Sequence, residues 1–150
     1  MSEHDLHIRR ADAGDVGSLA SLMGELGYPL SEADMANRMD YVAASPEDEI
    51  FVAEVAGEVV GMIGLRVSEC IDRVGRYGEI TALCVSSNHR RQGVATGLIR
   101  HIENVLTGLG VAACHVCAGM HREHEGHKFY QRMGFEPTGV RFIKSLRPDA

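Results

Sequence analysis

A short basic segment, residues 89–97 with the letters HRRQGVATG, holds the residue types and spacing that most directly suggest chemistry. Gly93 allows the backbone to approach a ligand closely, and the small Ala95 keeps that approach open. The first N–H groups of a following helix have no partners within that helix. Together with Arg90 and Arg91, these donors suit a phosphate or a pyrophosphate. A single glycine in a loop is a weak signal, and the same letters also fit a solvated turn before a helix.

A second group of reactive side chains lies between residues 114 and 127, where cysteines and histidines gather. Thiolates and imidazoles are ligands that zinc prefers. The spacing argues against a zinc site, because Cys114 and Cys117 are three residues apart in a predicted strand and point to opposite faces. The pair also has no second pair at zinc-finger spacing. We therefore expect no metal. The histidines of this group are His115, His121, His124 and His127. A solvated histidine-rich turn explains His124 and His127 as well as a shared helix face does, and His121 or His124 could instead line the acceptor site.

Hydrophobic periodicity predicts the elements that must position the basic segment. Residues 78–85 are largely apolar and include β-branched side chains, which is typical of a strand. From Val94 to Leu109 the apolar residues repeat at a period near 3.6, which indicates an amphipathic helix. The basic segment is therefore predicted to be a strand-to-helix turn.

The remaining elements complete an α/β pattern. Helices are predicted at residues 16–26, 31–44, 94–109 and 124–133. Further strands are predicted at residues 6–11, 49–55, 58–67, 111–117 and 139–146, with a short one at 135–136 as an additional candidate. A hairpin followed by strand–helix–strand crossovers implies a mixed central sheet of six to seven strands with helices on both faces. The 150 residues contain no repeat or linker, so we expect a single domain over residues 1–150.

Composition excludes several classes of partner. The 15 Lys and Arg against 21 Asp and Glu leave a formal net charge of -6, which argues against nucleic acid and anionic membranes and favours a cationic partner. No 18-residue apolar run is present, and the first ten residues, MSEHDLHIRR, lack an apolar stretch, so we expect a cytoplasmic protein. The four cysteines show no framework spacing and are expected to be reduced and mostly buried: Cys70, Cys84, Cys114 and Cys117.

The pattern Arg90-x-x-Gly93-x-Ala95 resembles the Q/R-x-x-G-x-G/A motif of the GNAT family of N-acetyltransferases, which cradles the pyrophosphate of acetyl-CoA. The preceding ITALCV, the amphipathic helix that follows, and HKFYQRMGFEPTGVRF, which resembles the family's FYxxxGF segment, agree with it. The similarity spans about residues 6–146 in element order, and its specific motifs lie within residues 79–135. The resemblance implies the GNAT fold, with a sheet splayed between its fourth and fifth strands.

The resemblance also implies a reaction and a donor site. An acetyl group would pass from acetyl-CoA directly to a primary amine within a ternary complex. Backbone groups of the fourth strand would meet the pantetheine arm at Leu83, Cys84 and Val85. The pyrophosphate would be met by the motif and its neighbours, namely Arg90, Arg91, Gln92, Gly93, Val94, Ala95 and Thr96.

Two catalytic residues follow from the same resemblance. Tyr130 matches the family tyrosine that protonates the departing thiolate, and a phenol of pKa ~10 is suited to a thiol of pKa ~8.5. Its spacing from Phe129 and Met133 also fits a packed face of a helix. Glu79 lies where some members place the carboxylate that deprotonates the amine, directly or through water, although an ion-paired strand residue fits too. Glu123 is a second candidate base, at a position where relatives often carry a polar residue that holds the cofactor arm.

The acceptor amine stays open at this point. Acidic residues in segments that the fold would place near the acceptor favour a small cationic amine; they are Glu69, Asp72, Glu79, Glu123 and Glu125. A protein N-terminus or lysine is the alternative acceptor. A module that binds acetyl-CoA as a sensor without turnover is the non-enzymatic alternative. Many domains of this kind dimerise, so a homodimer is a further expectation.

Overall fold

The computed structural model describes residues 5–117 and 126–149 of the chain. These residues belong to two units, Met1–Val116 and Cys117–Ala150. The first unit contains the sheet and the helices that cover it. The second contains one short helix, α4 (Gly126–Arg132), followed by an extended segment. That the whole chain forms one domain stays a prediction.

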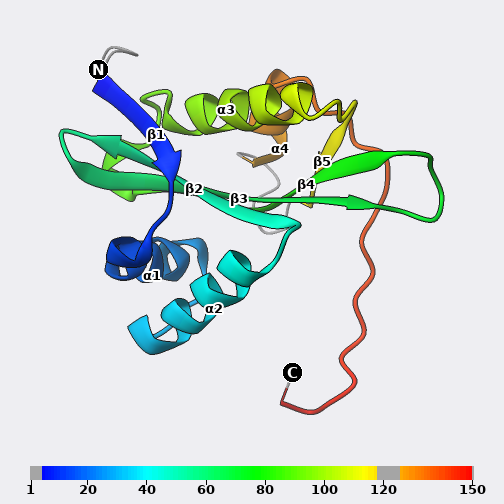
Figure 1. The fold of residues 1–150 in the computed structure, drawn as a ribbon. Coiled ribbons are helices and arrows are strands. Elements are labelled where there is room, and N and C mark those ends of the chain that lie inside the picture. Colours follow the sequence, from blue (N-terminus) through cyan, green and yellow to red (C-terminus); the bar gives the residue numbers. More distant parts are fainter. Residues whose placement is uncertain (1–4, 118–125, 150) are drawn as a thin grey trace. The chain divides into compact units, whose positions relative to one another are not determined.

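A mixed sheet forms the centre of the first unit, with strands in the order β1-β2-β3-β4-β5 (Figure 1). The first four strands form an antiparallel meander, and β5 pairs with β4 in parallel. The predicted mixed α/β fold is therefore confirmed. The bounds of the strands are β1 (Leu6–Arg10), β2 (Asp48–Val55), β3 (Glu58–Glu69), β4 (Arg76–Val85) and β5 (Cys114–Val116).

Helices cover both faces of this sheet. Two of them, α1 (Val16–Leu26) and α2 (Glu32–Ala44), lie on one face, and α3 (Val94–Gly108) lies on the other (Figure 1). The helices predicted at residues 16–26 and 31–44 are present. The Ser31 hydroxyl accepts from the Asp34 N–H at the start of α2, and Gly27, with φ 102°, ends α1. Glycine tolerates this left-handed conformation at little cost.

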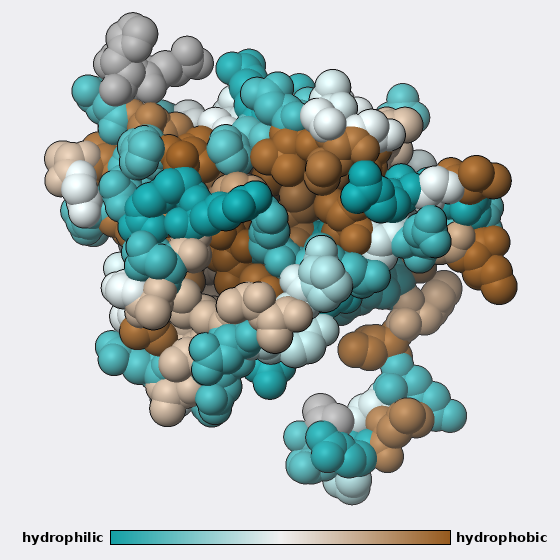
Figure 2. Space-filling view, in the orientation of Figure 1, coloured by the Kyte–Doolittle hydropathy of each residue, from teal (hydrophilic) through white to brown (hydrophobic). Residues whose placement is uncertain are grey.

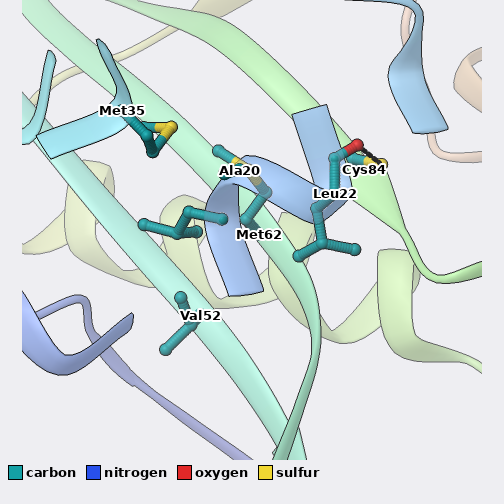
Figure 3. Close-up of a cluster of buried hydrophobic side chains, with 7 residues drawn as sticks. Ala20, Leu22, Met35, Val52, Met62 and Cys84 are labelled. Atoms are coloured by element: carbon teal, nitrogen blue, oxygen red, sulfur yellow. Dashed lines mark hydrogen bonds between the residues drawn. The ribbon is translucent and has the colours of Figure 1, made fainter. Parts of the chain in front are cut away.

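Buried side chains hold the helices against the sheet on both sides. The core under α1 and α2 is shown in Figure 3 and contains Leu19, Ala20, Leu22, Met35, Val52, Met62 and Cys84. On the opposite face, α3 buries Val94, Leu98, Ile99, Ile102 and Leu106. A Cβ at Gly61 of β3 would lie 2.9 Å from Val94 Cγ1, so the small residue lets the first turn of α3 contact the sheet. This contact places the start of α3 beside the end of β4.

A β-bulge interrupts the pairing of β3 with β4. Gly64 is opposite Ala82 while Leu65 is opposite Ile80, so Thr81 is an extra residue in β4. A Cβ at Gly64 would overlap the Thr81 hydroxyl, which requires glycine at that position. The bulge changes the alternation of side chains: a Cβ at Gly78 would meet Leu106 of α3, whereas Ala82 packs with the α1 core.

The hairpin between β3 and β4 ends in an exposed apolar tip. Ile71 and Val74 are fully exposed there, and Figure 2 shows hydrophobic side chains at the end of this hairpin. The strand predicted at residues 78–85 begins two residues earlier, at Arg76, which pairs with Glu69 of β3.

The number of strands differs from the prediction. The described part of the chain has a five-stranded sheet, whereas six to seven strands were predicted. The strand predicted at 111–117 covers only Cys114–Val116, because pairing with β4 begins at Gly78 opposite Cys114. The strands predicted at 135–136 and 139–146 are wrong: residues 139–146 include four exposed large apolar side chains and have no ladder partner. Alternation favours an extended chain, but a strand also needs a neighbour.

The cysteine prediction is partly wrong. All four thiols are free, as expected, but only Cys84 is buried; Cys70 and Cys114 are half-buried and Cys117 is exposed. Cys114 lies toward α3, and burial raises the pKa of its thiol.

Within residues 5–117 and 126–149, no helix combines the length and the apolar character needed to cross a membrane.

An ion-pair network joins β1 to the start of α1. Arg9 donates to both Asp15 carboxylate oxygens at 2.8 Å and, through Nε, to Glu54 Oε1 at 2.8 Å. Asp15 also accepts from the Asp12 N–H at 2.8 Å, which completes a capping box. The hydrogen bonds from Arg9 hold the pKa of Asp15 below its usual value, although burial acts in the opposite direction.

We predict that Asp15→Asn lowers the free energy of unfolding at pH 7 by about 2 kcal/mol, because a charge-assisted network is lost. A carboxyl whose pKa is lower in the folded state stabilises the protein above its unfolded pKa and loses that contribution as pH falls through the folded pKa. The difference between wild type and variant should therefore shrink in acid. Urea denaturation at pH 7 and at successively lower pH measures it.

Asp12→Asn is the matched control. The Asp12 side chain accepts from the Gly14 N–H at 2.9 Å, and asparagine caps helices about as well as aspartate. This variant should stay within about 0.5 kcal/mol of wild type. A difference for Asp15→Asn that is the same at every pH would contradict the ion-pair explanation.

Candidate active site

The edge of β4 that faces β5 becomes open after a short stretch of pairing. The parallel pairs are Gly78–Cys114, Glu79–His115 and Ile80–Val116, and in the described residues no strand continues beyond them. On the β3 side, the Ser86 N–H donates to the Val60 carbonyl at 2.8 Å. In an antiparallel pair, successive residues point their backbone groups alternately toward and away from the neighbouring strand. Because Ser86 bonds to β3, the backbone groups of Leu83 and Val85 point away from it. These two residues therefore turn backbone donors and acceptors toward the open edge.

Cys84, between those two residues, has a different role. Cys84 lies opposite Met62 of β3, and its backbone N–H and carbonyl groups point toward β3. Its thiol donates to the Leu22 carbonyl of α1 at 3.0 Å, as the dashed line in Figure 3 shows. Cys84 is 5% exposed, so it fastens β4 to the core beneath α1.

The N-terminus of α3 follows directly from this strand. Gly93 precedes the helix with φ 82°, and no side chain among the described residues caps it. The Gly97 N–H makes a helical bond to the Gly93 carbonyl at 2.9 Å, which leaves the N–H groups of Val94, Ala95 and Thr96 without acceptors inside the helix. Three donors and the positive end of the helix dipole make a site for an anion.

Polar side chains surround this helix start. Arg90, Arg91 and Gln92 are exposed, and Arg90 Nε donates to the Val85 carbonyl at 3.4 Å. Glu25 of α1 holds the preceding turn, because it accepts from the Ser87 N–H at 3.1 Å and from its hydroxyl at 3.3 Å. The turn is thus tied to α1 while its guanidinium groups stay accessible to an anionic ligand.

Glu79 lies on the sheet face opposite α3, since its neighbour Gly78 faces Leu106. Arg66 is directly opposite it on β3, and His115 is beside it on β5. The His115 Nε2 atom is 3.8 Å from Glu79 Oε1. Glu79 therefore lies between Arg66 and His115 on this face, and His115 was considered from sequence only as a metal ligand. The role of Glu79 as a base stays a prediction.

Tyr130 belongs to the second unit, in α4. It is half-buried, with ring centroids 5.3 Å from Phe129 and 5.6 Å from Phe135. The packing that its spacing predicted is therefore present, and its role as an acid stays a prediction. Glu123, Glu125, His121 and His124 lie outside the described residues.

The prediction that Cys114 and Cys117 point to opposite faces of one strand is not tested, because β5 ends at Val116. Cys114 and Gly78 share the α3 face, whereas His115 and Glu79 share the other. Among the residues that the structure describes, no three His, Cys, Asp or Glu side chains are grouped to hold a metal ion.

A family model described as the acetyltransferase (GNAT) family matches residues 19–135. The chain belongs to the GNAT acetyltransferase family. An aminoalkylphosphonate N-acetyltransferase of Salmonella typhimurium is 28% identical over 148 residues, covering 93% of this chain and 90% of that protein. Human N-acetyltransferase 8 is 36% identical over 94 residues, covering 62% of this chain and only 40% of that longer protein.

Solved structures share the fold of this GNAT chain. A transcriptional regulator from Bacillus halodurans superposes with a TM-score of 0.85 at 17% identity, covering 94% of this chain and 99% of that one. An aminoglycoside acetyltransferase from an uncultured soil metagenomic sample, in complex with sisomicin, gives 0.81 at 20% identity, covering 97% and 99%. The chain is by its family an acetyl-CoA-dependent N-acetyltransferase. GNAT acetyltransferases use acetyl-CoA. The pyrophosphate of acetyl-CoA is negatively charged, and the N-terminus of a helix such as α3 suits a negatively charged group.

We predict that Gly93→Ala weakens binding of coenzyme A about tenfold. A Cβ there would meet nothing within 4 Å among the described residues, but φ 82° strains any L side chain by about 1–2 kcal/mol, which the first turn of α3 relieves by moving its donors. Isothermal titration calorimetry with coenzyme A measures the loss.

Gly108→Ala is the matched control in the same helix. Gly108 has open space around it and no positive φ, so alanine should preserve affinity and stabilise α3 by about 0.5–1 kcal/mol. Equal affinity for Gly93→Ala and wild type would show that the start of α3 does not bind the pyrophosphate.

Proposed function

We propose that this protein transfers the acetyl group of acetyl-CoA directly to the primary amine of a small cationic acceptor, within a ternary complex. The observation that carries the proposal is the open edge of β4 at Leu83 and Val85, which leads straight into the uncapped start of α3. In acetyl-CoA, an extended arm that contains amides is followed by a pyrophosphate. This order matches the open strand edge followed by the N–H groups at the start of α3.

The donor would be held mainly by backbone. Leu83 and Val85 would pair with the pantetheine arm, with Cys84 fixing the strand between them. Val94, Ala95 and Thr96 would bind the pyrophosphate through N–H groups, and Gly93 would allow the turn. Arg90, Arg91 and Gln92 would supply charge and further donors. When bound, acetyl-CoA supplies the activated thioester.

Direct transfer to an amine requires a base, a polarised thioester carbonyl and an acid. Glu79 would take the proton of the amine, and the backbone donors of β4 would polarise the carbonyl. Tyr130 would donate its phenolic proton to the departing thiolate. A helix-bound phenol between Phe129 and Phe135 has a well-defined ring plane, which suits a positioned acid.

Charge supports a cationic acceptor. The net charge is -6, and Glu79 is accessible on its face, with its side chain 36% exposed. The relatives named for aminoalkylphosphonate and aminoglycoside acetylation act on molecules that carry amines. A protein N-terminus or lysine is the alternative acceptor, and an acetyl-CoA sensor is the alternative without turnover. A cytoplasmic location and a homodimer stay predictions.

A thiol-release assay with acetyl-CoA tests this proposal. The panel should contain polyamines, aminoglycosides, aminoalkylphosphonates and peptides with a free N-terminus or lysine. We expect release with at least one small amine and none without an acceptor. Tight acetyl-CoA binding without release for any amine would support the sensor, and release with peptides alone would support a protein acetyltransferase.

We predict that Tyr130→Phe lowers kcat by about 100-fold with little change in acetyl-CoA affinity. Phenylalanine keeps the ring contacts with Phe129 and Phe135 and removes only the hydroxyl. Steady-state kinetics and calorimetry on the same preparation separate the two effects. Unchanged kcat would remove Tyr130 as the acid.

A further inference from the structure

A row of charged side chains crosses the sheet through Glu79. Asp48 of β2 is opposite Arg66 of β3, Arg66 is opposite Glu79 of β4, and Glu79 is opposite His115 of β5. Directly opposite residues in adjacent strands project to the same face. The row therefore alternates a carboxylate, a guanidinium, a carboxylate and an imidazole across four strands.

Arg66 is anchored on the far side of this row. Its Nε donates to Asp48 Oδ1 at 3.0 Å, and Asp48 Oδ2 accepts from the Ser45 hydroxyl at 2.7 Å. Asp48 is 9% exposed, and it raises the pKa of the Arg66 guanidinium, to which Tyr41 and Glu79 also contribute. A fixed positive charge thus stands on the β3 side of Glu79.

His115 stands on the β5 side of Glu79, and only its Nε2 atom is placed to donate a hydrogen bond to the Glu79 carboxylate. Nδ1 is buried without a hydrogen-bond partner in the part of the chain that the structure describes. A proton on Nδ1 would have no acceptor there, whereas a proton on Nε2 would face the Glu79 carboxylate. Nε2 is the atom 3.8 Å from Glu79 Oε1, and such contacts commonly shorten when substrate binds.

Aromatic packing fixes the plane of the imidazole. The ring centroids of His115 and Tyr77 are 4.8 Å apart, and the Arg73 guanidinium carbon lies 3.9 Å from the centroid of the Tyr77 ring. Within the first unit, the charged and titratable groups that this row and stack place near Glu79 are Arg66, His115, Tyr77 and Arg73, with Asp48 and Tyr41 beyond Arg66. The stack limits rotation of the ring that carries Nε2.

We infer that His115 is a positioning residue for Glu79: together with Arg66 on the other side, it holds the carboxylate in place to meet the acceptor amine. This inference rests on the proposed role of Glu79 as the base. His115 is not itself that base, because its accessible nitrogen faces Glu79 and its other nitrogen is buried. Nε2 faces one of the two Glu79 carboxylate oxygens at 3.8 Å, and a hydrogen bond formed when this contact shortens would orient the carboxylate.

His115→Leu and His115→Gln test the contact. Leucine removes the donor, so kcat/KM should fall about tenfold and the acid limb of its pH profile should move to higher pH, because the carboxylate loses a stabilising N–H. The amide N–H of glutamine can replace Nε2–H and should restore most of the activity and the original limb. The loss should vanish in a Glu79→Gln background.

His7→Leu is the control, because His7 is an exposed histidine on β1 of the same sheet and should behave as wild type. Three results would overturn the inference. Leucine and glutamine could lose activity equally, the loss could persist in the Glu79→Gln background, or the acid limb could disappear. The last result would make His115 the base.

A measurement without substrate separates this inference from the proposed function. The carboxyl carbon of Glu79, followed by NMR across pH, should titrate at higher pH in His115→Leu than in wild type. An unchanged titration refutes the contact, whether or not any amine is acetylated. Absence of turnover with a shifted titration would refute the proposed function alone.

Discussion

The early end of pairing between β4 and β5 is the constraint on which the rest of the structure depends. Only three residue pairs join these strands, so the backbone groups of Leu83 and Val85 are left toward an edge that no strand covers in the described residues. Backbone groups need partners, and an open edge is a template for an extended ligand. The core under α1 and the helix α3 hold β4 from its two faces, with Cys84 bonded to Leu22, so the edge stays in place.

The proposed anion site at the start of α3 would consist of backbone N–H groups, and its geometry depends on how the helix packs against the sheet. The donors of Val94, Ala95 and Thr96 are positioned because Val94 is buried against Gly61 and because Glu25 holds Ser87 in the turn. The arginines of the turn are exposed and add charge to a site whose geometry is already set. The same strand and helix thus connect the core, the open edge and the anion site.

The β-bulge at Thr81 divides β4 into two functional parts. Before it, Glu79 lies in a row of alternating charges with Arg66 and His115. After it, Ala82 and Cys84 face the α1 core, and Leu83 and Val85 turn backbone groups toward the open edge, where Arg90 Nε donates to the Val85 carbonyl. One extra residue therefore changes which side chains share a face with the Glu79 carboxylate. In a strand without the bulge, the side chains of the ten residues of β4 would alternate between the two faces of the sheet without interruption.

The sequence by itself determined the local features: the bounds of α1, α2 and α3 to within one residue, the β2–β3 hairpin, and the turn that leads into α3. These depend on side chains and backbone preferences within a few residues, which periodicity and capping rules describe. Only the tertiary structure decided the length of β5, the unpaired state of residues 139–146 and the partnership of Glu79 with Arg66 and His115. Strand pairing and register join residues that are far apart in the chain. A one-residue bulge moves the side chains that follow it to the opposite face of the sheet, and no local sequence pattern reveals this change.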